Sequence, residues 1–164
     1  MNHKDGISGL TTGEYMSGSG GSNVSECGPE AAWSDLCAHR SSLLVDVRTR
    51  PEWSFVGVPD LQTAEAGMML SEWRQFPGMG INPDFATTLL ADLGQEMPEK
   101  IYFICRSGAR SMEAARAVAE VLNTRGKSVE CINVAEGFEG DIDQDGHRGR
   151  KTGWKARGLP WRQT

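Results

Sequence analysis

The sequence contains only four cysteines among its 164 residues, and no two of them form a Cys-X-X-Cys pair. Small secreted domains that depend on disulfides have a much higher cysteine density, so a disulfide framework is not expected. The chain also lacks an apolar run of about 18 residues, which a membrane helix requires, and its amino terminus has no apolar signal core. These absences predict a cytoplasmic protein with reduced thiols and no membrane partner.

An excess of positive charge is missing as well, because 22 acidic residues outnumber 17 basic ones and give a net charge of −5. This balance argues against nucleic acid as the main partner. The length, with 38% hydrophobic residues, suffices for one domain with a real core and is too short for two ordinary domains.

Composition divides the chain into three segments. Residues 1–24 are rich in glycine and serine, most clearly at 17–22, and are predicted to form a disordered leader. Residues 25–140 carry the alternating apolar patterns of a folded domain. Residues 141–164 are polar and irregular but contain Trp154 and Trp161, so we expect a carboxy-terminal tail that packs on the domain.

Hydrophobic periodicity predicts helices over residues 29–39, 85–93 and 109–125, and strands over 43–47, 101–104 and 129–134. Pro29 suits an early helical position, while Gly94 and Gly126 suit helix ends. Residues 68–73 contain a further candidate strand. The pattern predicts an α/β fold with a mostly parallel sheet of about five strands and helices on both faces.

The most informative segment runs from Ile101 to Ser111, where a buried-strand pattern meets a helix pattern through residues 105–110. Cys105 therefore follows the carboxyl end of a strand, the edge at which open α/β sheets bind ligands. A thiol beside a helix amino terminus and two arginines has its thiolate stabilised, so Cys105 is expected to be largely ionised at neutral pH. A merely structural thiol would not explain two arginines and a glycine within five residues.

The other loop residues suit the same chemistry. Gly108 permits a backbone turn that directs amides inward, and Ser107 can donate its hydroxyl or cap the helix. Arg110 can hold the loop or bind a substrate oxyanion, and Arg106 adds charge at the rim.

The segment from Cys105 to Ser111 resembles the active-site loop of the rhodanese family of sulfurtransferases. Residues 43–48 with the following Glu52-Trp53 resemble that family's early strand and acidic-aromatic pair, and Asn133-Val134 with Gly137-Phe138 resemble its closing strand and turn. The resemblance covers about residues 26–140 and implies a single-domain rhodanese-like fold. It also implies that Cys105 is catalytic, that no cofactor or metal takes part, and that the substrate is bound by Arg106, Ser107, Gly108, Ala109 and Arg110.

In that family the thiolate takes the outer sulfur of a donor such as thiosulfate and passes it from a persulfide to a nucleophile. The resemblance thus implies a sulfurtransferase with a small anionic sulfur donor and a cyanide, thiol or protein acceptor. Related cysteine phosphatases have a longer loop preceded by histidine, and Ile104 occupies that place here, which disfavours phosphatase activity. A non-enzymatic persulfide carrier or docking module that serves a partner protein stays open as an alternative.

Asp46 and Arg48 end the early strand at the same sheet edge. They either orient the cysteine loop or form a structural ion pair, for example Arg48 with Glu52, and the structural interpretation is slightly favoured. Trp53 is expected in the core. Five arginines are expected to give the site a positive mouth: Arg48, Arg50, Arg106, Arg110 and Arg116.

Two other patterns resemble metal sites. Residues 141–146 match the first half of a calcium loop, but Thr152 occupies the position that needs a bidentate glutamate, so a polar turn is favoured. Cys37 and His39 lack a second ligand pair. Residues 78–80 are expected to form a loop near the mouth of the site, and the nearby methionines fit core filling better than a docking surface.

Overall fold

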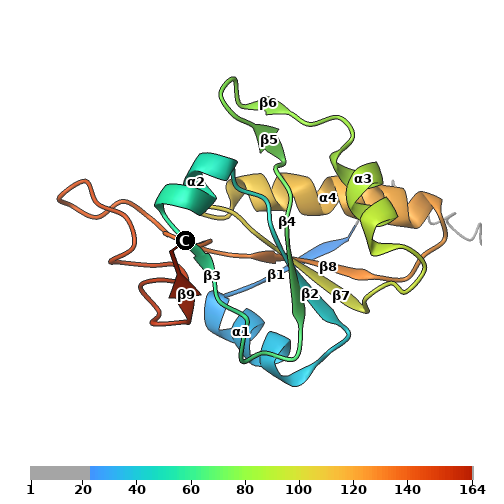
Figure 1. The fold of residues 1–164 in the computed structure, drawn as a ribbon, viewed down its shortest axis with the longest axis horizontal. Helices are drawn as coiled ribbons and strands as arrows, with labels where there is room; N and C mark the ends of the chain where they lie inside the picture. Colours follow the sequence, from blue (N-terminus) through green and yellow to red (C-terminus); the bar gives the residue numbers. More distant parts are fainter. Residues whose placement is uncertain (1–22, 164) are drawn as a thin grey trace, which may run out of the picture.

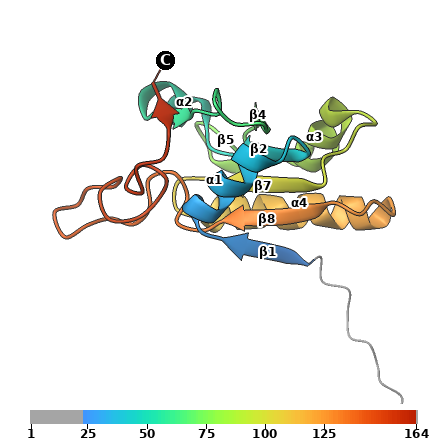
Figure 2. The ribbon, with the colours of Figure 1, turned by 90° about the horizontal axis from the view of Figure 1, so that it is seen from below.

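Five parallel strands form the centre of the protein in a computed structural model that describes residues 23–163. The strand order is β1-β8-β7-β2-β4, so β7 lies in the middle and β1 and β4 form the edges (Figures 1 and 2). The register pairs Val45 of β2 with Phe103 of β7, and Phe103 with Asn133 of β8. The five strands are β1 (Val24–Cys27), β2 (Ser42–Asp46), β4 (Gly67–Leu70), β7 (Lys100–Ile104) and β8 (Glu130–Val134).

Helices cover both faces of this sheet. Helices α3 (Phe85–Leu93) and α4 (Ala109–Thr124) lie on one face, and α1 (Pro29–Ala38) lies on the other (Figure 1). Alternate residues of β7 point to opposite faces, so Phe103 joins the core under α3 and α4 while Ile104 joins the core under α1. The expected α/β fold, with a five-stranded sheet and helices on both faces, is therefore confirmed.

Short elements occupy the carboxyl side of the strands. Helix α2 (Arg50–Phe55) follows β2, and a small antiparallel hairpin joins β5 (Arg74–Gln75) to β6 (Gly80–Ile81). Neither α2 nor the hairpin was predicted, and β1 was also missed. Thr49 and Glu52 form a capping box that begins α2, a signal present in the sequence.

The segment after β8 returns along the domain. Trp154 is completely buried and packs edge to face against Trp33 of α1, with ring centroids 5.8 Å apart. Strand β9 (Trp161–Arg162) then pairs antiparallel with β3 (Val58–Pro59), beside α2 (Figure 1). Asp143 accepts hydrogen bonds from the amides of Asp145 and His147, which gives residues 143–147 the form of a polar turn.

The expected leader lies outside the described residues except for Asn23 and Val24, and Val24 already begins β1. Between residues 23 and 163, no helix has the length and apolar character that a bilayer crossing needs.

Candidate active site

Cys105 follows β7 directly, in the middle of the sheet, and only 1% of its surface is exposed. Its Sγ accepts hydrogen bonds from the amide of Gly108, at 3.1 Å, and from the hydroxyl of Ser111, at 3.2 Å. Gly108 has φ +103°, which turns its amide toward the sulfur, and it begins α4. Two donors and a helix amino terminus therefore face one sulfur, an arrangement that stabilises negative charge on it.

The loop after Cys105 is held by the turn that follows β8. Phe138 donates its amide to the carbonyl of Cys105 at 2.8 Å, and the amides of Glu139 and Gly140 donate to the carbonyl of Arg106 at 3.0 Å. Gly137 approaches so closely that a Cβ there would lie 2.5 Å from the Cys105 carbonyl oxygen and 2.6 Å from the Ser107 nitrogen. A side chain at position 137 would therefore push the loop away.

Ser111 connects the sulfur to a buried polar chain. Its hydroxyl lies 2.6 Å from Oδ1 of Asn133, whose Nδ2 donates to Glu26 at 2.6 Å. Ser111 and Asn133 are 0% and 1% exposed. The hydroxyl also lies 3.2 Å from the carbonyl oxygen of Gly108. Because a hydroxyl has one hydrogen, Ser111 donates to the sulfur, to Asn133 or to Gly108 at any moment. Ser111 was part of the recognised segment but was not predicted as a site residue.

Arg110 forms a bidentate ion pair with Glu52 of α2. Its Nη1 lies 2.9 Å from Oε2 of Glu52, and its Nη2 lies 2.6 Å from Oε1. Burial alone would raise the pKa of Glu52, but the hydrogen bonds from Arg110 and Thr49 lower it to about 2. Burial likewise opposes the charge of Arg110, and Glu52 raises the pKa of that guanidinium. Of the two predicted roles for Arg110, the geometry favours holding the loop.

The sulfur lies at a pocket of about 450 Å³ between α2, the loop and the β5–β6 hairpin. Arg106 and Arg110 are the only two of the five arginines expected at the mouth that line this pocket, so that expectation is wrong in part. Phe76 and Met79 form an apolar wall, which places the predicted 78–80 loop at the mouth. The lining consists of Thr49, Pro51, Glu52, Phe76, Met79, Cys105, Arg106, Ser107, Ala109 and Arg110.

Ser107 lines the pocket, but α4 has no side-chain cap, so the predicted capping role of Ser107 is wrong. Ala109 lines the pocket as the first residue of α4.

Asp46 and Arg48 form an ion pair of 2.6 Å, and both side chains are fully buried. The suggested pair of Arg48 with Glu52 is therefore wrong, because Glu52 binds Arg110 instead. The Arg48 guanidinium also donates to the carbonyl of Gly57 and lies 4.1 Å above the ring centre of Phe138. Neither Asp46 nor Arg48 lines the pocket. Their contact with the cysteine loop is indirect, through Phe138.

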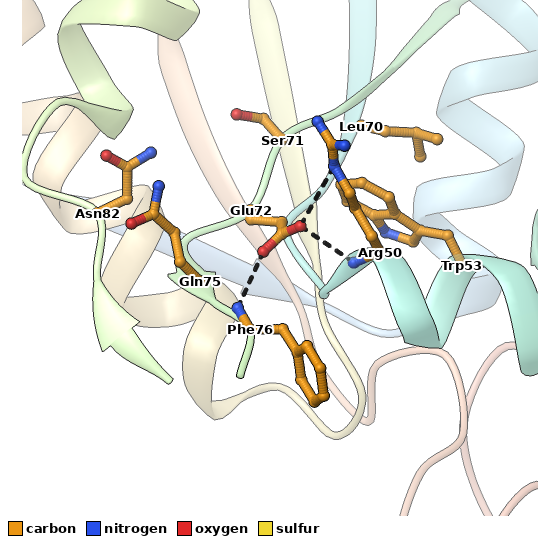
Figure 3. A pocket seen from close by; sticks show the side chains of 8 residues that line it. All are labelled: Arg50, Trp53, Leu70, Ser71, Glu72, Gln75, Phe76 and Asn82. Carbon is orange, nitrogen blue, oxygen red and sulfur yellow. Dashed lines mark hydrogen bonds and ion pairs between the residues drawn. The ribbon is translucent and has the colours of Figure 1, made fainter. Parts of the chain in front are cut away.

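A second pocket, of about 560 Å³, shares Phe76 with the first (Figure 3). At its centre Glu72 accepts hydrogen bonds from the backbone amides of Arg50 and Phe76, both at 3.2 Å. Glu72 thus ties the start of α2 to the hairpin. Trp53 is half-buried and lines this second pocket, so the expectation that it belongs to the core is wrong.

The other cysteines differ from Cys105 in their surroundings. Burial raises the pKa of Cys131 to about 12 and raises that of Cys27 as well, which keeps both protonated at neutral pH. Among the described residues, one group has ligand atoms close enough to share a metal ion: Asp143, Asp145 and His147, within 4.8 Å of one another. This group lies in the tail, and His39 at the end of α1 is placed beside Asp35 instead.

Comparisons with known proteins agree with this fold. No protein-family model matches the chain. The Rickettsia rickettsii protein named "Uncharacterized protein RP600 homolog" is 35% identical over 130 residues, which is 79% of this chain and 90% of that protein. The crystal structure of Rv0390 from M. tuberculosis matches with a TM-score of 0.71 and 42% identity, covering 86% of this chain and 98% of that one.

More distant matches include a polysulfide-sulfur transferase homodimer from Wolinella succinogenes, with a TM-score of 0.52 and 20% identity, covering 86% of this chain and 80% of that one. A rhodanese-like domain protein from Staphylococcus aureus matches with a TM-score of 0.45 and 20% identity, covering 70% of this chain and 87% of that one. The Wolinella likeness concerns the fold alone, and the α/β fold with its parallel sheet is the one expected from the sequence. By identity and coverage, the chain belongs to the same family as the Rickettsia rickettsii protein and Rv0390.

Proposed function

We propose that this protein is a sulfurtransferase that carries sulfane sulfur as a persulfide on Cys105. The observation that carries the proposal is the environment of the Cys105 sulfur. This sulfur lies at the edge of an open pocket, within hydrogen-bond distance of the Gly108 amide and the Ser111 hydroxyl. The donors that stabilise the Cys105 thiolate before it attacks also stabilise it as the leaving group when the persulfide is discharged. The fold of the Wolinella polysulfide-sulfur transferase is compatible with this chemistry.

The reaction takes place in two displacements. The Cys105 thiolate attacks the outer sulfur of thiosulfate, a sulfur–sulfur bond forms, and sulfite leaves with the electron pair of the broken bond. A nucleophile such as cyanide or a thiolate then attacks the outer sulfur of the Cys105 persulfide. Thiocyanate, or a new persulfide, leaves and the thiolate is restored. No external oxidant or reductant is consumed.

Charge at the mouth suits an anionic donor. Arg110 is committed to Glu52, so attraction of the donor falls to Arg106, which is exposed and has no ion pair with another described residue. An exposed guanidinium at the rim accelerates the approach of an anion without holding the product tightly.

Intact-mass measurement after incubation with thiosulfate tests the proposal. The protein is expected to gain the mass of one sulfur atom and to release it on addition of cyanide. The Cys105→Ser variant is expected to gain nothing, whereas Cys37→Ser, which removes a half-buried thiol outside the site, is expected to behave as the wild type. Sulfur uptake that survives in Cys105→Ser, or no uptake from thiosulfate or any organic persulfide, would contradict it.

A second candidate is a persulfide carrier that serves a partner protein. It is favoured by the apolar side chains on the hairpin beside the mouth, since Phe76 is 58% and Ile81 is 51% exposed. Steady-state turnover separates the candidates. Repeated cycling with thiosulfate and cyanide supports the enzyme, while a persulfide that forms but is not discharged by small nucleophiles supports the carrier.

A further inference from the structure

The tail forms a third pocket that adjoins the cysteine site. This pocket has a volume of about 540 Å³ and shares Glu52 and Arg106 with the pocket of Cys105. Its other wall comes from the segment after β8, including Arg148 and Arg150, which lies on the same side of the molecule as α2 (Figure 1). Arg106 therefore stands between the two pockets and belongs to both.

Positive charge dominates this tail pocket. Arg106, Arg148 and Arg150 line it together with His147, against the carboxylates of Glu52 and Glu139. Glu52 is already bound by both Nη atoms of Arg110. Glu139 is then the acidic lining residue that has no arginine pair among residues 23–163.

The arginines of the tail differ in how firmly they are held. Arg148 is oriented by a hydrogen bond of 2.6 Å from its Nη1 to the carbonyl of Gly140. Arg150 is 62% exposed and reaches Asp143 only at 4.0 Å, so its guanidinium is available to a ligand.

The two adjoining pockets are larger than a small inorganic donor needs. Each lies within the range of about 300–1,000 Å³ that is typical of sites for organic ligands. A thiosulfate ion bound at Cys105 would leave the tail pocket unused. An organic thiol or persulfide, in contrast, would place its sulfur at Cys105 and its remaining groups in the second pocket.

We propose that the sulfur donor is a persulfide of an organic thiol that carries carboxylates at a distance from its sulfur, and that Arg106, Arg148 and Arg150 bind those carboxylates. This inference rests on the sulfurtransferase function proposed above. The Cys105 thiolate attacks the outer sulfur of R–S–SH, the bond between the two donor sulfurs breaks, and R–S⁻ leaves with its electron pair. The products are Cys105–S–SH and the free thiolate, so charge and atoms balance.

Donor competition tests the inference. Rates of sulfur transfer to cyanide are measured with glutathione persulfide, which carries two carboxylates, and with mercaptoethanol persulfide, which carries none. In Arg150→Ala the ratio of kcat/KM for the first donor to that for the second is expected to fall about 3- to 5-fold, as for loss of one partly exposed ion pair. Arg150→Glu is expected to lower this ratio further.

Arg40→Ala is the matched control, because Arg40 is 87% exposed and, within the described part of the chain, pairs with Glu65 alone, away from both pockets. Its ratio is expected to equal that of the wild type. Calorimetric binding of S-methylglutathione, which cannot transfer sulfur, gives a second measurement that does not depend on turnover, and its affinity is expected to fall in Arg150→Glu.

The outcomes are distinguishable. If Cys105 takes sulfur from both persulfides, but the donor ratio and the S-methylglutathione affinity are unchanged in Arg150→Glu, the tail pocket is not a carboxylate site and this inference alone fails. If Cys105 takes sulfur from no donor, the proposed function fails, and the inference fails with it.

Discussion

At the scale of single residues, the site depends on a few donors aimed at one sulfur. The amide of Gly108 belongs to the backbone and is not removed by truncating a side chain, whereas the hydroxyl of Ser111 is. Ser111 is also shared with Asn133, so it links the sulfur to the buried chain that ends at Glu26. The contribution of Ser111 is therefore measurable.

Ser111→Ala is expected to lower kcat/KM for sulfur transfer about 10-fold or more, because a hydrogen bond to a charged group contributes about 1.5–3 kcal/mol. The free energy of unfolding should fall by about 1–3 kcal/mol, since Oδ1 of Asn133 loses its partner. Thr124→Ala is the control, as it removes a hydroxyl from the exposed end of the same helix. A rate within twofold of the wild type would show that Ser111 is not needed.

Gly137→Ala is expected to destabilise the protein by about 2–4 kcal/mol in urea titrations, because the new Cβ would meet three backbone atoms of the cysteine loop. Gly126→Ala is a close control. Gly126 has nearly the same φ, +63° against +66°, but no atom of residues 23–163 lies within 4 Å of the place that a Cβ would take there. A loss of only about 1–2 kcal/mol is therefore expected. Equal losses in the two variants would mean that the close approach is unimportant.

The functional residues of the cysteine loop could be predicted from the sequence, but the residues that they contact could not. Cys105, Arg106 and Gly108 are adjacent in sequence, so a local pattern reveals them. Glu52 and Arg110 are 58 positions apart, and no local rule connects them. The sequence therefore left two roles open for Arg110, holding the loop or binding a substrate oxyanion. Only the tertiary structure shows that its partner is the carboxylate of Glu52.

At the scale of elements, α2 is tied to the start of α4 by the ion pair between Glu52 and Arg110. Because the pKa of Glu52 falls from its ordinary value of 4.5 to about 2 on folding, the charged form favours the folded state. This stabilisation is fully present above about pH 4.5 and is lost as the pH falls toward 2.

Glu52→Gln tests this element contact. The wild type is expected to be more stable than the variant at pH 6, and the gap in the free energy of unfolding should narrow steadily as the pH is lowered from 5 to 3. Glu65→Gln controls for loss of a negative charge, because Glu65 is exposed and its one ion pair with the described residues is with Arg40. A gap that is independent of pH would contradict the role assigned to the pair.

The long elements were predictable and the short ones were not. Helices α3 and α4 and strands β2, β7 and β8 were expected within a residue or so, because each repeats its apolar pattern over several positions. The β5–β6 hairpin has two residues in each strand, too few for any period, and its apolar residues Phe76 and Ile81 are exposed. Strand β1 is an edge strand with a mixed burial pattern, so its sequence resembles a polar linker.

At the scale of the whole molecule, the tail is part of the same core. Trp154 is among the largest fully buried side chains and belongs to the cluster that also contains Leu36 and Phe138. The expectation that the tryptophans of the tail would bury followed from composition alone; it is confirmed for Trp154 and wrong for Trp161, which is 40% exposed at the edge of the molecule in β9. The contact of the tail with the cysteine pocket did not follow from composition.

Trp154→Ala is expected to cost about 3–5 kcal/mol in the free energy of unfolding, as for other buried aromatic truncations, with a single cooperative transition. Trp161→Ala should cost less, because Trp161 is 40% exposed. A loss below about 1 kcal/mol for Trp154→Ala, or two separate transitions, would indicate that the tail folds apart from the sheet.

Backbone hydrogen bonds from the turn after β8 also set an order of events during synthesis. The amides of Phe138, Glu139 and Gly140 donate to the carbonyls of Cys105 and Arg106. On the ribosome, Cys105 is translated more than thirty positions before these partners, and the loop cannot take its final shape until they have left the exit tunnel. Until then the thiol of Cys105 lies in a loop that lacks the backbone partners it has in the folded protein.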